Sequence, residues 1–197
     1  RVLGGSNIYE STTEIISDGT ATVPTHTSGT TDGKHTGYKL AGCSALQELR
    51  CYASRITGPI PSFSSNTNLR RIDIRGTKIS GGDPGVATAD QTHVIGSSTF
   101  SQCAKLETFY FSGTPFAKGN NTSDPIEDGI HQNAFLDTIE MRNLLIQSNY
   151  QISGRLPIFT TMTKLYYLAL QANRFTGTLP TFSSNKQLGY MYLHNNE

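Results

Sequence analysis

The residue types that most often carry catalysis or bind metals do not occur here at the spacings those functions need. The five histidines show no metal-ligand spacing, and the H-E-x-x-H, G-x-S-x-G, P-loop and dinucleotide-binding patterns are missing. Lys118 lies beside glycines in a stretch that resembles a phosphate loop, but the lysine precedes the glycine. Glu127 and Asp128 are adjacent carboxylates without a visible partner. We therefore expect no enzyme, no cofactor and no metal site. The histidines are His26, His35, His93, His131 and His194.

Two residue types suited to binding, tyrosine and arginine, recur at alternate positions of short stretches. Examples are RIDIR, which starts at Arg71, and YMYLH, which starts at Tyr190. On a strand, alternate side chains project from the same face. Tyrosine and arginine carry much of the energy of protein interfaces, and a tyrosine ring with its polar tip also suits sugars. The alternative reading is that tyrosine is simply a favourable residue in any sheet.

These stretches belong to a repeat with a period of about 23 residues. Successive repeat starts are separated by 23, 37, 35, 24 and 23 residues, so two turns carry about a dozen extra residues each. The starts are Leu46, Leu69, Leu106, Met141, Leu165 and Leu188.

Three columns of this alignment have a consistent chemical character. The residues three after each start are Leu49, Ile72, Phe109, Leu144, Leu168 and Met191, and those five after are Cys51, Ile74, Phe111, Ile146, Leu170 and Leu193. The residues eight after are Ser54, Thr77, Thr114, Asn149, Asn173 and Asn196. The first two columns predict one short strand per coil, stacked in parallel about 4.8 Å apart. The third predicts side chains that bond backbone groups in the following bend.

The pattern L-x-x-L-x-L-x-x-N-x-L is the signature of the leucine-rich repeat. The tails TGPIPSF, SGRLPIF and TGTLPTF resemble the plant-type repeat of extracellular receptor domains and of inhibitors of cell-wall enzymes. IGSSTFSQCAKLETFYFSGT, from Ile95, resembles the BspA-like repeat of microbial surface proteins. The resemblance covers about residues 43 to 197. It implies a solenoid with a curved parallel sheet on the concave face, an irregular or short-helical convex side and few long helices.

The residues two, four and six after each start should project from the concave face. We expect partner binding there through Arg50, Tyr52, Arg71, Asp73, Arg75, Tyr110, Gln147, Tyr167, Gln171, Tyr190, Tyr192 and His194.

Residues 1–36 are rich in serine and threonine and lack the repeat, which predicts a linker or cap. Apolar pairs there, such as Val2 and Leu3, are candidate edge strands. Residues 37–197 form the predicted repeat domain, with inserts near 82–100 and 120–138 and continuation beyond the C-terminus. The second insert is acidic but lacks a calcium-loop pattern, and Asn120 and Asn121 begin overlapping glycosylation sequons.

The three cysteines, Cys43, Cys51 and Cys103, are an odd number, so they cannot form a fully paired set of disulfides within the chain. Cys43 and Cys103 lie at the same repeat position, two coils apart. That separation is about 10 Å, too far for a disulfide. Their placement predicts buried thiols.

The net charge of +1 does not favour nucleic acid as a partner, and no apolar run approaches the roughly 20 residues that span a bilayer. We expect a secreted, cell-surface or virion protein that binds protein or glycan as a recognition or adhesion module. The alternative is a structural subunit of an extracellular assembly, such as a phage tail fibre or a microbial filament. Residues 46–80 carry a net charge of +4 and residues 120–140 one of −5, an asymmetry that could steer a partner or dock one copy onto another head to tail.

Overall fold

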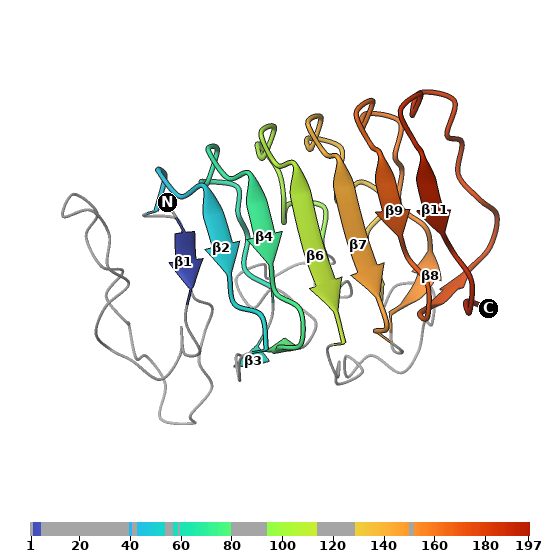
Figure 1. Cartoon of the computed structure of the whole chain (residues 1–197), viewed down its shortest axis with the longest axis horizontal. Helices are drawn as coiled ribbons and strands as arrows, with labels where there is room; N and C mark the ends of the chain where they lie inside the picture. The colour runs from blue at the N-terminus through green and yellow to red at the C-terminus, as the bar shows by residue number, and fades with distance from the viewer. Residues whose placement is uncertain are drawn as a thin grey trace.

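The strands of successive repeats stack side by side into one parallel sheet. In this computed structural model the described residues are 2–4, 40, 43–53, 57–58, 60–79, 94–113, 129–149 and 152–197. The sheet has the order β1-β2-β4-β6-β7-β9-β11, and its coils follow one another along the long axis from the N-terminal to the C-terminal end (Figure 1). Its strands are Val2–Gly4, Glu48–Arg50, Arg71–Asp73, Thr108–Ser112, Asn143–Gln147, Tyr167–Ala169 and Tyr190–Tyr192.

Two small parallel ladders lie outside this sheet. Strand β3 (Thr57–Gly58) pairs with β5 (Lys78–Ile79), and β8 (Ser153–Arg155) pairs with β10 (Arg174–Thr176). The described ranges contain no α-helix. Within these ranges the convex side therefore consists of irregular backbone and short ladders, as the prolines and glycines of the repeat predict.

The predicted strand columns are the core of the protein. Ile72 faces Leu49 on one side and Phe109 on the other, and the same register continues to β11. The inward residues from Leu49 to Leu168 are buried, each contributing about 1.5–3 kcal/mol by burial. Met191 is 46 % exposed because β11 is the last strand of the sheet.

A second core column consists of phenylalanines six residues before five of the six repeat starts, with Leu40 at the equivalent position before Leu46. Phe63 stacks on Phe100 with ring centroids 5.8 Å apart, and Phe100 stacks on Phe135 at 5.2 Å. Phe159 and Phe182 stack at 5.4 Å in the last two coils. In the sequence these phenylalanines stand at a constant distance before the repeat starts. The alternating pattern of the strands does not predict them, because they lie outside the strands.

Asparagines eight residues after the start bond the backbone of two coils, as expected. Asn173 Nδ2 donates to the carbonyl oxygens of Ile146 (2.6 Å) and Leu170 (2.8 Å), and its Oδ1 accepts from the Asn149 amide. Asn196 makes the equivalent two donations one coil later, to the carbonyl oxygens of Leu170 and Leu193, and its Oδ1 accepts from the Phe175 backbone amide. These bonds satisfy buried backbone groups that strand pairing leaves open.

The residue before that asparagine column has a positive φ in each of the six coils. The values are 52° at Ala53, 64° at Gly76, 64° at Gly113, 56° at Ser148, 56° at Ala172 and 59° at Asn195. Only two of these positions are glycine. In the other four coils the left-handed conformation of a non-glycine residue costs about 1–2 kcal/mol of conformational free energy. The bend that aims the asparagine into the core requires this conformation.

Several sequence predictions fall partly or wholly outside the described residues. Val2 and Leu3 do lie in an edge strand, β1, which pairs with β2. Of the predicted linker or cap at residues 1–36, residue 1 and residues 5–36 lie outside the described ranges, as do residues 82–93 of the first insert and residues 120–128 of the second, including Asn120 and Asn121. Among the described residues, no helix could cross a lipid bilayer.

The thiols of Cys51 and Cys103 are buried, as predicted, whereas Cys43 is half-buried. Burial, with a smaller effect of Asp73, raises the pKa of Cys51 to about 12. Burial, with a smaller effect of Asp137, raises the pKa of Cys103 to about 12. Almost no thiolate therefore exists at these two sites near neutral pH, and the thiolate is the reactive form.

We expect iodoacetamide at pH 8 to alkylate Cys43 first and to reach Cys51 and Cys103 only after denaturation. Peptide mapping by mass spectrometry measures the three rates separately. Labelling of Cys51 in the native protein as fast as that of Cys43 would contradict the burial described here.

Replacing Asn173→Ala should lower the free energy of unfolding by about 2–3 kcal/mol, because it leaves the Ile146 carbonyl and the Asn149 amide without their side-chain partner and removes one of the two donors to the Leu170 carbonyl. Urea denaturation measures the change. Asn143→Ala is the matched control: its side chain makes one long contact of 3.4 Å to Thr108, so a change within about 0.5 kcal/mol is expected. Equal effects of the two substitutions would show that the asparagine column does not hold the coils.

Candidate partner-binding face

The sheet register places the predicted site residues on one face but divides them into two groups. On β4 and β6, Arg71 and Asp73 lie next to Thr108 and Tyr110. On β9 and β11, Tyr167 lies next to Tyr190, and Ala169 next to Tyr192. Strand β7 separates the groups.

The first group is an arginine cluster, formed by Arg71, Asp73, Arg75 and Tyr110. Asp73 is 2 % exposed and accepts two hydrogen bonds from Arg75, from Nε at 2.8 Å and from Nη2 at 2.6 Å. Arg71 Nη2 lies 3.8 Å from the same carboxylate. Both guanidinium groups lie over the Tyr110 ring, 4.9 Å from its centre.

The positive charges of Arg71 and Arg75 are partly neutralised within the cluster by the Asp73 carboxylate. The hydrogen bond with Asp73 raises the pKa of Arg75, and bidentate pairing fixes the guanidinium plane. The cation–π contacts to Tyr110 hold Arg71 and Arg75 further. Next to this cluster, Arg50 pairs with Glu48 on β2. Tyr52 follows β2 and is 61 % exposed.

The second group is a continuous series of ring contacts that we call the aromatic track: Tyr166, Tyr190, Tyr167, Tyr192 and His194. The ring centroids of Tyr167 lie 5.7 Å from those of Tyr190 and 5.5 Å from those of Tyr192. Tyr192 meets His194 edge-on at 6.4 Å. Burial, followed by the effect of Tyr192, raises the pKa of Tyr167. Of the other predicted residues, Gln171, two residues after the end of β9, donates a hydrogen bond to Gln147, the last residue of β7, at 2.7 Å.

Tyr166 is the member of the track that the sequence pattern missed. It lies one residue after the repeat start, outside the alternating outward positions, yet it is 48 % exposed and meets Tyr190 edge-on at 5.4 Å. A hydrogen bond with Tyr190 raises the Tyr166 pKa. The ring passes over Gly189, where an added Cβ would lie 3.0 Å from Tyr166 Cε2. In the sequence, Gly189 is the feature that could have predicted this contact, because it leaves room for the ring at a position where other coils carry larger side chains. The residues one after the earlier repeat starts are Gln47, Arg70, Glu107 and Arg142.

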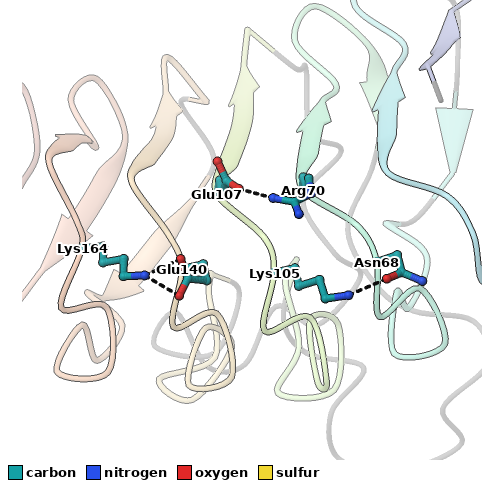
Figure 2. Close-up of polar contacts among 6 residues, drawn as sticks. All are labelled: Asn68, Arg70, Lys105, Glu107, Glu140 and Lys164. Atoms are coloured by element: carbon teal, nitrogen blue, oxygen red, sulfur yellow. Dashed lines mark hydrogen bonds and ion pairs between the residues drawn. The ribbon is translucent and has the colours of Figure 1, made fainter.

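Polar contacts between neighbouring coils line the flank where the chain enters the strands (Figure 2). Arg70 pairs with Glu107, Lys105 donates to Asn68, and Lys164 pairs with Glu140, each at 2.6 Å. The bond from Lys164 lowers the pKa of Glu140. These contacts are exposed to water, which screens them, so they position the coils relative to one another without forming a reactive site.

Histidine and acidic residues do not gather into a metal site within the described ranges. His131 accepts a hydrogen bond from the Asn133 amide in a local turn, and His194 belongs to the aromatic track. His26, His35 and His93 lie outside the described ranges, as do the adjacent carboxylates Glu127 and Asp128.

Comparisons with solved structures agree with this architecture. The plant peptide hormone receptor RGFR1, in complex with RGF2, matches with a TM-score of 0.63 and 22 % identity over 80 % of this chain. The ectodomain of the Arabidopsis thaliana receptor kinase GASSHO1/SCHENGEN3, in complex with CASPARIAN STRIP INTEGRITY FACTOR 2, matches with 0.55 and 21 % over 80 %. A TDR receptor matches with 0.56 and 19 % over 79 %.

The fold is a leucine-rich repeat solenoid. The chain spans 22 %, 16 % and 27 % of the length of these three structures, so the likeness concerns the solenoid and not the whole receptors. No family model and no curated protein matches the sequence. The assignment of individual coils to plant-type and BspA-like subtypes stays a prediction.

Replacing Asp73→Ala should lower the free energy of unfolding by about 1–3 kcal/mol, because it removes a buried acceptor of charged hydrogen bonds. Glu107→Ala also removes an arginine partner, but an exposed one, so a change within about 0.5 kcal/mol is expected. Urea denaturation of both variants provides the comparison. If Asp73→Ala leaves the free energy of unfolding unchanged, the arginine cluster is not a structural unit.

Proposed function

We propose that this chain is a non-enzymatic recognition module of an extracellular or surface-exposed protein, and that its concave face binds a protein partner through an extended segment. The observation that carries the proposal is the aromatic track. Tyr190 is 46 % and Tyr192 36 % exposed, and both project from the sheet face opposite the core. The fold does not require large aromatic rings there, since Ala169 occupies the equivalent outward position next to Tyr192.

The energetics of the track favour binding. A tyrosine side chain has two rotatable bonds, so its immobilisation costs little entropy relative to the area that it buries. The track rings already contact one another, which reduces that cost further. Tyrosines in such clusters are frequent hot spots of protein interfaces.

The similar solved structures add a coarser argument. RGFR1 is a peptide hormone receptor in complex with RGF2, and it shares the solenoid fold with this chain. Solenoids present long concave surfaces suited to extended partners. By contrast, an assembly subunit is expected to form stable oligomers by itself, whereas a recognition module needs its partner.

A random peptide library displayed on phage tests the proposal. We expect selection on the wild-type protein to enrich peptides whose affinity falls at least about tenfold for a triple variant, Tyr167→Ser, Tyr190→Ser and Tyr192→Ser. The triple variant should keep its thermal unfolding midpoint close to that of the wild type, because these side chains lie on the surface.

The matched control is Tyr52→Ser, which removes an exposed tyrosine just after β2, at the other end of the described sheet from the track. It should leave the affinity of the selected peptides unchanged. Failure to enrich any peptide, or enrichment of peptides that bind the triple variant equally well, would overturn the proposal.

A further inference from the structure

The outward positions of the last three coils form an uncharged surface. They contain amides, tyrosines, one histidine and two small or apolar residues, and none is aspartate, glutamate, lysine or arginine. These positions are Asn143, Leu145, Gln147, Tyr167, Ala169, Gln171, Tyr190, Tyr192 and His194. A charged group of a ligand would lose hydration here without gaining an ionic partner. The surface therefore favours an uncharged ligand segment.

The aromatic track has a direction. Its ring contacts lead from Tyr166, beside the entry to β9, to His194, beyond the end of β11. The tyrosine contacts alternate between the β9 and β11 sides, and the series as a whole advances along the strands. Tyr190, Tyr192 and His194 are alternate residues, so they recur about every 6.6 Å along the strand. An extended peptide that lies parallel to β11 presents its own alternate side chains with the same period.

The spacing between rings limits how a ligand binds. Neighbouring tyrosine rings have centroids 5.4 to 5.7 Å apart and are inclined by 38° to 80°. A flat group inserted between two rings needs about 7 Å, twice the contact distance of carbon atoms. The ligand therefore lies on top of the track, with its apolar side chains against the exposed ring surfaces.

Gly189 and Tyr166 extend this surface beyond the strand face. Gly189 leaves room for the Tyr166 ring to reach Tyr190, whose edge-on contact holds it. A ligand long enough to cover Tyr190, Tyr192 and His194 therefore meets Tyr166 at the start of the track.

We propose that the aromatic track binds an uncharged, extended peptide segment that lies parallel to β11 and carries aromatic or other apolar side chains at alternate positions. This inference rests on the proposed function and specifies its ligand. Tyr166 belongs to the binding surface, and the arginine cluster does not.

Synthetic peptides with tryptophan test the spacing and the charge. The protein has no tryptophan, so tryptophan fluorescence reports on the peptide alone. The first probe is a seven-residue peptide with blocked ends, tryptophan at its second, fourth and sixth positions, and serine elsewhere. The second has the three tryptophans adjacent, and the third has aspartate in place of serine. We expect the first to bind about tenfold more tightly than either of the others.

Substitutions test the place of binding. Tyr166→Ser should weaken the first probe about tenfold, Tyr166→Phe should preserve its affinity, and Gly189→Ala should weaken it while keeping every ring of the track. Arg71→Ala should leave the affinity unchanged. Thermal unfolding of each variant separates a loss of binding from a loss of folding.

Three results would overturn the inference: equal affinity for adjacent and alternate tryptophans, no effect of Tyr166→Ser, or displacement of the first probe by neutral oligosaccharides. If peptides selected from the library still require Tyr167, Tyr190 and Tyr192, such a result removes the inference and leaves the proposed function standing. If those peptides ignore the triple variant, both fail.

Discussion

Backbone carbonyls in the bends of each coil must find donors, and this requirement sets the structure of the solenoid. Strand pairing satisfies the sheet, but the bends leave carbonyls in the core. Asn173 and Asn196 each bond one carbonyl of their own coil and one of the preceding coil. Asn66 and Asn185, three residues before a repeat start, likewise donate to two carbonyls of the preceding coil. Because these bonds join consecutive coils, they fix the register of the strands.

The register in turn determines the chemistry of the concave face. It brings Tyr110 next to Asp73, whose carboxylate already lies between Arg71 and Arg75 of its own coil, and the ionic and cation–π contacts make one self-contained unit. In the last two coils it brings tyrosines next to one another without any charged neighbour at the outward positions. The single binding face expected from the sequence therefore consists of two surfaces in the structure, and we propose that the aromatic one contacts the partner.

The sequence was sufficient to predict the parallel strands, the inward columns and the bonding of the asparagine column, because each depends on the spacing within a single coil. It did not predict features that depend on what lies beside a residue in the next coil. The burial of Asp73 results from neighbours on its own and adjoining strands, and the position of Tyr166 from the glycine 23 residues later. The stacked phenylalanines were detectable as a column, but their ring contacts depend on how neighbouring coils lie against one another.

The central claim, that the aromatic track and not the arginine cluster contacts the partner, can be tested by NMR on protein with ¹³C-labelled tyrosine rings. A peptide selected for binding is added stepwise and the ring signals are followed. Our account predicts that the signals of Tyr166, Tyr167, Tyr190 and Tyr192 move together with one dissociation constant, while those of Tyr52 and Tyr110 stay in place. If the Tyr110 signal moves while the signals of Tyr190 and Tyr192 stay in place, the result contradicts the claim that the aromatic track contacts the partner.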